Sequence, residues 1–462
     1  MKLHIKAAIL LTAVASAIPA TAQYTTSAYF LDGYNYRHLL NPAFGNDSNL
    51  YFSVPALGNW NVSLAGNLNL DDILYNVNGQ TTTFLNPGVS SSEFLGNISD
   101  KNSLNLDLRL DILSVGFKGF GGYNTIGIAA RSNVAATIPG SLLRLAKEGP
   151  ANDSYDISDF KAHADAYAEI AFGHSRQINQ KLRVGGKLKF LVGLANVDAD
   201  FSKASLTLGT DGWTAVTNAT VQASIKGLSY ITEQKLRGPE GSKTTHTYVS
   251  DLDLDNTGIN GFGLAIDLGA DYTLNSDWEF SAALLDLGFI SWNNNMVAST
   301  NGDKSFDTDT YIFNVDKDAS NSFGDELDRL AEGLSTLYEL QDNGDTGGRT
   351  KMIAATLNLA AQYTLPVYNK LKFGLLNTTR IQEDYTWTDF RLSANVRPIK
   401  LISAALSASA GTYGCSVGWL FNLNAPGFNF FIGMDRIPLK FSKQYVPLSS
   451  NASINFGFNV QL

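Results

Sequence analysis

Apolar and polar residues alternate one by one along several long stretches of this chain. Between Leu104 and Ile112 every second residue is leucine or isoleucine. The positions between them are polar, namely Asn105, Asp107, Arg109 and Asp111. Segments 160–172 and 182–194 repeat the pattern, with one apolar face and one charged face each. A period of two is typical of β-strands, because successive side chains point to opposite faces of a sheet.

The length of the alternation favours strands that cross a membrane. It persists for about 10 to 14 residues, whereas soluble strands average about 5–6 residues and a tilted membrane strand needs about 9–11. In a barrel the charged face would line the lumen, since a basic side chain facing lipid at mid-membrane costs roughly 2–4 kcal/mol. The candidate lumen-lining residues are Asp107, Arg109, Asp111, Lys161, His163, Asp165, Glu169 and Lys187. We favour a hydrogen-bonded network that supports these charges or anchors a plug over a polar conduit.

An uncharged stretch near the C-terminus can be read as a membrane helix or as strands. Residues 401–434 contain no charged residue. Ile402, Ala404 and Leu406 nevertheless alternate with small residues, and glycines interrupt the stretch, so we favour strands. The last residues, from Ile454 to Leu462, alternate in the same way. The chain is therefore expected to end on a strand.

Short and long connections separate the alternating segments. Short turns are predicted at 174–182, 272–278 and 363–372, where polar residues and a proline interrupt the pattern. Long connections are predicted at about 71–103, 135–159, 226–258 and 293–349. A membrane barrel with short periplasmic turns and long outer loops accounts for this asymmetry.

The N-terminus has the features of a secretory signal peptide. Lys2 and Lys6 precede an apolar stretch from Ala7 to Ile18, and small residues at Ala20 and Ala22 precede Gln23. The apolar stretch is too short to span a bilayer comfortably, so cleavage near Ala22/Gln23 is predicted. The mature chain is expected to be exported.

Composition excludes several classes of protein. The chain has 34 basic against 43 acidic residues, so it lacks the basic footprint of a nucleic-acid-binding protein. Its single cysteine excludes an internal disulfide, and neither a second thiol nor clustered histidines support a zinc site. Much of the acidity lies in residues 293–349, which hold 12 acids and four bases. No cofactor and no metal are expected.

A resemblance to a known superfamily lies in the N-terminal region. Residues 37–44, Arg-His-Leu-Leu-Asn-Pro-Ala-Phe, resemble the Asn-Pro-Ala element of long-chain fatty-acid transporter (FadL-like) barrels. Segments 172–178, 263–272 and 286–292 resemble an uncharacterised branch of that superfamily. The resemblance implies an all-β, transmembrane antiparallel barrel of about 14 strands. It also implies an N-terminal lumenal hatch that contains Asn41, Pro42, Ala43 and Phe44.

The expected organisation follows from these features. Residues 1–22 form the signal peptide, 23–58 the hatch and the start of the barrel, and 59–462 the barrel with its long outer loops. Short helices are expected in outer loops. One is an amphipathic helix whose apolar side would collect ligand or pack against the rim. Its candidate ligand contacts are Leu327, Leu330, Leu334, Leu337 and Tyr338. The shorter segment 142–147 invites the same two interpretations.

Candidate catalytic and calcium motifs are weak. Residues 414–418 match the pattern Gly-x-Ser-x-Gly, but all five histidines precede Ser416, whereas the hydrolase fold needs one after the serine. Asp251, Asp253 and Asp255 resemble the start of a calcium loop, but the required glycine and glutamate do not follow. We therefore expect no enzymatic activity and interpret the aspartates as a solvated loop.

Three functional hypotheses remain. The first is an outer-membrane barrel of a Gram-negative bacterium for passive transport of small hydrophobic molecules. The second is an outer-membrane docking or secretion-accessory barrel with an unknown protein partner. The third is a secreted β-rich adhesin. For a barrel, the expected partners are outer-membrane lipid, a small hydrophobic ligand and the barrel assembly machinery, which reads a final strand. This strand departs from the usual pattern by ending in Leu462 instead of an aromatic residue.

Overall fold

The computed structural model describes most of the chain. The described residues are 25–46, 48–78, 80–148, 154–208, 213–237, 244–307, 337, 339–437 and 451–462. The expected signal peptide lies outside them, and so do Leu327, Leu330, Leu334 and Tyr338 of the expected loop helix. Leu337 is described and is half-buried.

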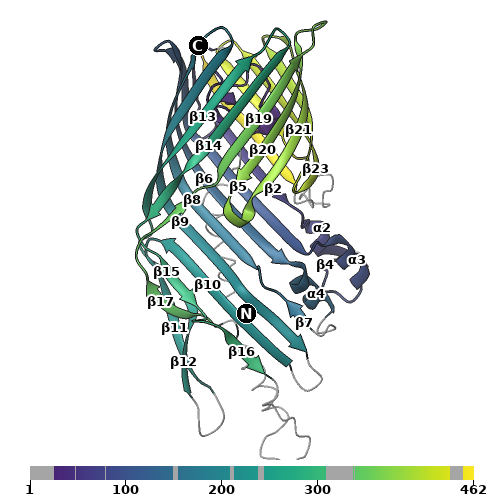
Figure 1. Ribbon diagram of the computed structural model, residues 1–462, viewed down its shortest axis with the longest axis vertical. Helices are drawn as coiled ribbons and strands as arrows, with labels where there is room; N and C mark the ends of the chain where they lie inside the picture. Colours follow the sequence, from purple (N-terminus) through teal and green to yellow (C-terminus); the bar gives the residue numbers. More distant parts are fainter. Residues whose placement is uncertain are drawn as a thin grey trace, which may run out of the picture.

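The strands close into one antiparallel barrel of 14 strands (Figure 1). Each strand pairs with the next, and the last one closes the ring by pairing with the first two segments of the wall. In order around the barrel, the strands are β1 (Leu50–Ser53) continued by β2 (Asn59–Gly66), β5 (Lys101–Gly119), β6 (Gly122–Pro139), β8 (Lys161–Gln177), β9 (Leu182–Leu208), β13 (Gly261–Thr273), β14 (Trp278–Trp292), β19 (Ala355–Thr364), β20 (Leu371–Ile381), β21 (Trp387–Ile399), β22 (Ile402–Gly411), β23 (Gly414–Ala425), β24 (Phe428–Met434) and β25 (Ala452–Gln461). The predicted barrel is confirmed.

The uncharged stretch forms strands, as its alternation predicts. It spans β22, β23 and β24, and β22 pairs with β23 from Ile402 to Gly411. Among the described residues, no helix has both the length and the apolar character needed to cross a membrane. The final alternating segment is β25, which runs to Gln461.

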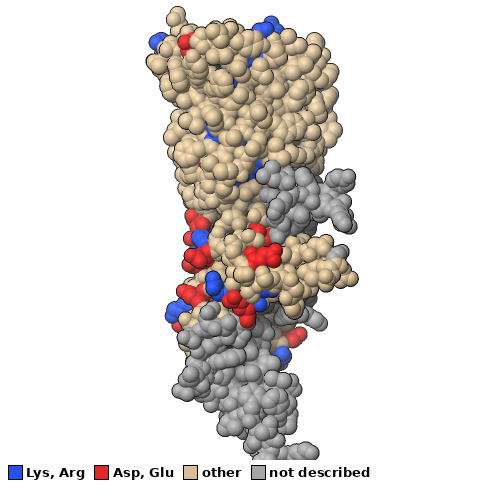
Figure 2. All heavy atoms as spheres, turned by 90° about the vertical axis from the view of Figure 1, so that its right-hand side faces the viewer, with Lys and Arg blue, Asp and Glu red and all other residues tan. Residues whose placement is uncertain are grey.

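The wall has an apolar outer face and a polar inner face. Phe190 of β9 and Leu268 of β13 are 44% and 53% exposed, while Lys187, Lys189 and Asp267 on the same two strands are buried. Figure 2 shows few charged side chains over the barrel half of the visible surface and a concentration of them below it. This arrangement suits a wall that faces lipid, because the apolar side chains face outward while the charged side chains face the lumen.

Connections differ between the two ends of the barrel. Short turns join β8 to β9, β13 to β14 and β19 to β20 at one end, at the predicted positions. The long connections lie at the opposite end, which we call the outer end. There the sheet projects beyond the closed barrel as β9 continues and pairs with β10 (Figure 1). The projecting strands are β7 (Ser154–Asp156), β10 (Trp213–Ile225), β11 (Leu228–Arg237), β12 (Thr244–Leu254), β15 (Met296–Ser299), β16 (Lys304–Asp307), β17 (Gln341–Asp345) and β18 (Arg349–Met352).

The expected acidic loop at 251–255 is corrected by the structure. Asp251 and Asp253 lie on β12, which forms a regular hairpin with β11. The alternation Asp-Leu-Asp-Leu places these carboxylates on one face of a strand, where a calcium loop cannot form. Among the described residues, no group of three or more His, Cys, Asp or Glu side chains could hold a metal ion.

Short helices occur in the outer connections, as expected. They are α2 (Leu70–Ile73), α3 (Ser91–Asn97) and α4 (Gly140–Glu148), together with the small hairpin of β3 (Leu74–Val77) and β4 (Gln80–Thr83). Leu143 of α4 and Phe94 of α3 share a buried cluster with Leu68 and Val89. Segment 142–147 therefore packs against neighbouring loops instead of presenting a free apolar face.

Candidate functional site

Residues 25–46 fold inside the barrel, and we call them the lumenal segment. It contains the 3-10 turns η1 (Thr26–Ala28) and η2 (Arg37–Leu39). Wall residues contact it from different sides: Asn358 of β19 donates a hydrogen bond to the Leu40 carbonyl (2.9 Å), and Asn422 of β23 donates to the Gly33 carbonyl (3.1 Å). The segment is thus held mainly by side chains of the wall.

The Asn41–Phe44 motif lies at the centre of these contacts. The Asn41 amide donates to the Ala270 carbonyl of β13 (3.2 Å), and its oxygen accepts from the Ala43 N–H (2.9 Å). Gly269 makes this approach possible, because a Cβ there would lie 2.1 Å from Asn41 Oδ1. A Cβ at Gly185 would lie equally close to the Pro42 carbonyl oxygen. Asn41 is therefore both a local turn residue and a link to the wall.

Two carboxylates fix the rest of the lumenal segment. Asp435, just after β24, accepts hydrogen bonds from the backbone N–H groups of Thr26 (2.6 Å) and Ser27 (2.7 Å). Asp32 pairs with Lys372 of β20 at 2.6 Å and with Arg37 at 3.1 Å. These contacts join the segment to the wall by ionic groups at two separate places.

A cluster of buried charges, which we call the charged band, crosses the lumen on the outer side of the lumenal segment. Its members are Arg109 and Asp111 of β5, Arg131 of β6, Glu169 of β8, Lys187 and Lys189 of β9, Asp267 of β13 and Asp286 of β14. These are four bases and four acids, so the formal charges balance. Mutual pairing satisfies charges that would be costly to bury alone.

Glu169 and Asp286 are the hubs of the charged band. Glu169 lies 3.0 Å from Arg131, 3.3 Å from Arg109 and 3.8 Å from Lys189. Asp286 lies 2.8 Å from Arg131 and 2.5 Å from Lys189. Each hub therefore joins bases from different strands.

A bulge in β14 directs Asp286 into the lumen. The register between β13 and β14 shifts here by one residue, so that Leu285 and Asp286 are both fully buried although they are consecutive. Asp286 adopts φ +58°, a conformation that costs energy for a residue with a side chain. Its N–H is satisfied by Asp267 Oδ1 at 2.8 Å. The charged band compensates for this strain.

The charged band also contacts the lumenal segment. Lys187 Nζ lies 2.8 Å from His38 Nδ1, and His38 Nε2 lies 2.7 Å from the Tyr51 hydroxyl. All three residues are buried. Movement of the lumenal segment would therefore leave Lys187 without this partner.

The structure brings together most of the residues predicted to line the lumen. Asp107, Arg109, Asp111, Asp165, Glu169 and Lys187 are buried. His163 and Lys161 lie nearer the outer end, where His163 bonds Asp198 (2.7 Å) and Lys161 pairs with Asp384 (2.8 Å). Their bonds to one another and to opposite strands form a network.

Several members of the network were not among the predicted residues. These are Arg131, Lys189, Asp267, Asp286 and Arg380. Lys189 shares the alternation of its strand and could have been chosen by the same rule. Arg131 lies in a strand rich in alanine and glycine, and Asp286 lies on a bulge, so neither stands out by periodicity.

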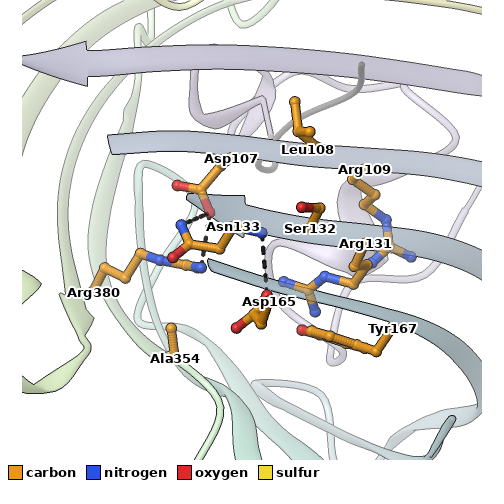
Figure 3. Close-up of a pocket in the computed structure, with 10 residues that line it drawn as sticks. All are labelled: Asp107, Leu108, Arg109, Arg131, Ser132, Asn133, Asp165, Tyr167, Ala354 and Arg380. Carbon is orange, nitrogen blue, oxygen red and sulfur yellow. Dashed lines mark hydrogen bonds and ion pairs between the residues drawn. The ribbon is translucent and has the colours of Figure 1, made fainter. Parts of the chain in front are cut away.

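A small cavity lies between the charged band and the outer end (Figure 3). Asp107, Arg131, Asn133 and Arg380 are among the residues that line it. Its volume is about 10 Å³, at the lower limit of what one water molecule requires. The side chains that line this cavity therefore leave room for about one water molecule between them.

The Gly-x-Ser-x-Gly match lies on a strand. Ser416 is in β23, and its hydroxyl is 2.7 Å from the Ser409 hydroxyl of β22. A nucleophile elbow needs a sharp strand-to-helix turn, and β23 continues through Ser416 to Ala425.

Comparison with known proteins identifies a family and several similar structures. The family of unknown function DUF5723 matches residues 42–435. No sequence among the curated proteins matches the chain.

Three solved structures are similar to this chain over nearly their whole length. The Ralstonia pickettii toluene transporter TbuX is 10% identical and the similarity covers 96% of this chain and 95% of that one, with a TM-score of 0.40. The Pseudomonas putida toluene transporter TodX is 10% identical over 96% and 94%, with a TM-score of 0.37. A Pseudomonas aeruginosa FadL homologue is 10% identical over 96% and 98%, with a TM-score of 0.35. The fold assigned to this chain rests on the strand pairing described above.

Proposed function

We propose that this chain, which belongs to the DUF5723 family of unknown function, is an outer-membrane barrel for passive passage of small hydrophobic molecules, with the lumenal segment as its hatch. One observation carries the proposal. Among the described residues, the lumenal segment is held in the barrel by side-chain contacts and forms no strand pair with the wall. Such a segment can shift without breaking the barrel's own hydrogen-bonded ladder.

Apolar contacts between the lumenal segment and the wall favour a hydrophobic solute. Tyr29, Phe30 and Phe44 of the segment pack in one buried cluster with wall residues. On the wall side the cluster includes Leu285, Leu376, Ala405, Leu420 and Phe431. Polar solutes would not bind these apolar wall residues favourably. When the lumenal segment moves, an apolar solute could instead take the place of its aromatic side chains against the wall.

Flux into liposomes tests the proposal. The purified barrel is reconstituted and given fatty acids and other apolar solutes. We expect uptake above that of empty liposomes, and faster uptake with Asp435→Ala, because this change removes three hydrogen bonds that hold the start of the lumenal segment. Asp277→Ala, in the short turn before β14, is the matched control. Uptake that never exceeds that of empty liposomes for any variant would exclude this function.

A docking barrel is the second candidate, and the projecting sheet favours it. β9 has 27 residues, whereas a tilted membrane strand needs about 9–11. Much of β9 therefore lies outside the membrane, where it supports β10 and the hairpin β11–β12. A protein partner that co-purifies in stoichiometric amount, and is lost when residues 228–254 are deleted, would support docking.

The location and biogenesis of the protein are part of the proposal. We infer a Gram-negative outer membrane, after cleavage near Ala22/Gln23, with lipid around the barrel and β25 as the strand that the assembly machinery reads. The rival interpretation, a soluble adhesin, predicts that the protein leaves the membrane fraction without detergent. Membrane fractionation with heat-modifiable gel mobility separates the two.

A further inference from the structure

A second segment reaches across the lumen near its outer end. It runs from Arg380, at the end of β20, through the 3-10 turn η3 (Glu383–Tyr385), and we call residues 380–385 the crossing segment. Arg380 Nη2 donates to Asp107 Oδ1 of β5 at 2.9 Å, and both side chains are buried (Figure 3).

The strands joined by this ion pair lie on opposite sides of the barrel. Six strand positions separate β5 from β20 in either direction around the ring. Fourteen strands spaced about 4.8 Å apart and tilted by about 40° would make a circular barrel roughly 28 Å wide. One arginine and one aspartate cannot span that width, so the end of β20 lies closer to β5 at this level than it would in a circular barrel.

The same side of the crossing segment makes further contacts with the far wall. Gln382 Nε2 donates to Asn133 Oδ1 of β6 at 2.6 Å, and Asn133 Nδ2 donates to Asp107 at 2.9 Å. Asp384 pairs with Lys161 of β8 at 2.8 Å. Residues 380, 382 and 384 thus bind three neighbouring strands in succession.

The backbone of the crossing segment is strained. Glu383 has φ +36°, in the region that residues with side chains rarely adopt. Such a conformation costs about 1–3 kcal/mol and persists only where surrounding contacts hold it. The contacts of residues 380, 382 and 384 with the far wall can hold Glu383 in this conformation. If these contacts were lost, the crossing segment would detach from the far wall.

The crossing segment and the lumenal segment are separate structures. Among the described residues, the backbone of Arg380 and Ile381 pairs with the neighbouring strands β19 and β21. The side chains of residues 380–385 make hydrogen bonds and ion pairs with β5, β6, β8 and Lys351, and none goes to residues 25–46. The small cavity of Figure 3 lies beside Arg380. Removal of the lumenal segment alone would leave these contacts in place.

We propose that the crossing segment is a second closure of the lumen, which must detach before a solute entering from the outer end reaches the charged band and the hatch. Its role in transport rests on the proposed function. The closure itself can be measured without any transported solute, by access of a reagent from outside.

Cysteine labelling tests the closure. In a Cys415→Ser background, which removes the native exposed thiol, Ala354→Cys places a reporter in the wall of the cavity. A membrane-impermeant maleimide added to intact cells should label it slowly. The combined change Arg380→Ser, Gln382→Ser and Asp384→Ser should raise the labelling rate by about tenfold or more, because detachment becomes the favoured state.

A matched control and a milder variant keep the test decisive. Lys203→Ser removes an exposed ion pair with Asp303 on the projecting sheet (2.6 Å) and should leave the rate unchanged. Asp384→Lys alters an exposed position, so folding is preserved, and it should speed labelling. Adding Lys161→Asp restores an ion pair of opposite polarity and should slow labelling again.

The outcomes separate the closure from the proposed function. Labelling that is equally fast in all variants, or a charge swap that does not restore slow labelling, overturns the closure. Faster labelling without uptake of any apolar solute supports the closure and refutes the transport function. Uptake of apolar solute with unchanged labelling supports transport and refutes the closure.

Discussion

Replacing Glu169 with glutamine should destabilise the barrel strongly. The Glu169 side chain is 1% exposed and lies within 3.8 Å of Arg109, Arg131 and Lys189. Removing one partner of a buried ion pair costs about 3–5 kcal/mol, because the remaining charge is left uncompensated. Here each base keeps another acid: Arg109 keeps Asp111, while Arg131 and Lys189 keep Asp286. We therefore expect Glu169→Gln to lower the free energy of unfolding by about 3 kcal/mol, the lower end of this range.

Denaturant unfolding in lipid vesicles, followed by tryptophan fluorescence, measures this loss. The matched control is Glu383→Gln. The Glu383 side chain is 65% exposed and pairs with Lys351 at 3.2 Å, so its loss should cost less than about 1 kcal/mol. If Glu169→Gln costs no more than the control, water screens the charged band and the lumen is not closed there.

Further predictions concern the lipid face, the hatch and the crossing segment. Leu268→Arg should cost about 2–4 kcal/mol of folding free energy in vesicles, whereas Leu236→Arg, at a 65% exposed position of the hairpin β11–β12, should cost less than about 1 kcal/mol. Gly269→Val should displace the lumenal segment and expose it to added protease, and Gly96→Val, with no atom within 4 Å of its Cβ, should not. Labelling of the cavity reporter should become faster as salt rises, since the exposed ion pairs of the crossing segment are screened.

Much of the barrel could be predicted because one face of each strand contacts lipid and the other faces the lumen. The alternation of apolar and polar residues in the strand's own sequence reflects these two faces. On β9 the exposed Leu188 and Phe190 alternate with the buried Lys187 and Lys189. The lipid imposes one face and the lumen the other, and no knowledge of the neighbouring strands is needed. Alternation also predicted β22, where Ser403 and Ser407 are buried and Leu406 is exposed.

Pairing across the lumen could not be predicted in this way. Asp107 and Arg380 are 273 residues apart, and their contact depends on which strands lie opposite each other after the ring closes. The hatch motif has the same limitation. Asn41 could be recognised from resemblance, but its place against Gly269 depends on a close approach between segments that are distant in sequence.

The bulges explain where the alternation fails, and they mark the closed part of the lumen. The register shifts next to Asp111 on β5 and at Asp286 on β14 both lie in the charged band. The shift at Leu194 on β9 lies between Lys189 of the band and Asp198 near the outer end. A bulge changes which face the following residues occupy, so a carboxylate can enter the lumen from a strand whose pattern places it outside. Residues 284–288, Leu-Leu-Asp-Leu-Gly, show this break. The two consecutive leucines interrupt the alternation. From Asp286 on, the even-numbered residues face the lumen instead of the odd-numbered ones. A break within an otherwise regular strand is therefore the sequence signal that could have placed Asp286 in the lumen.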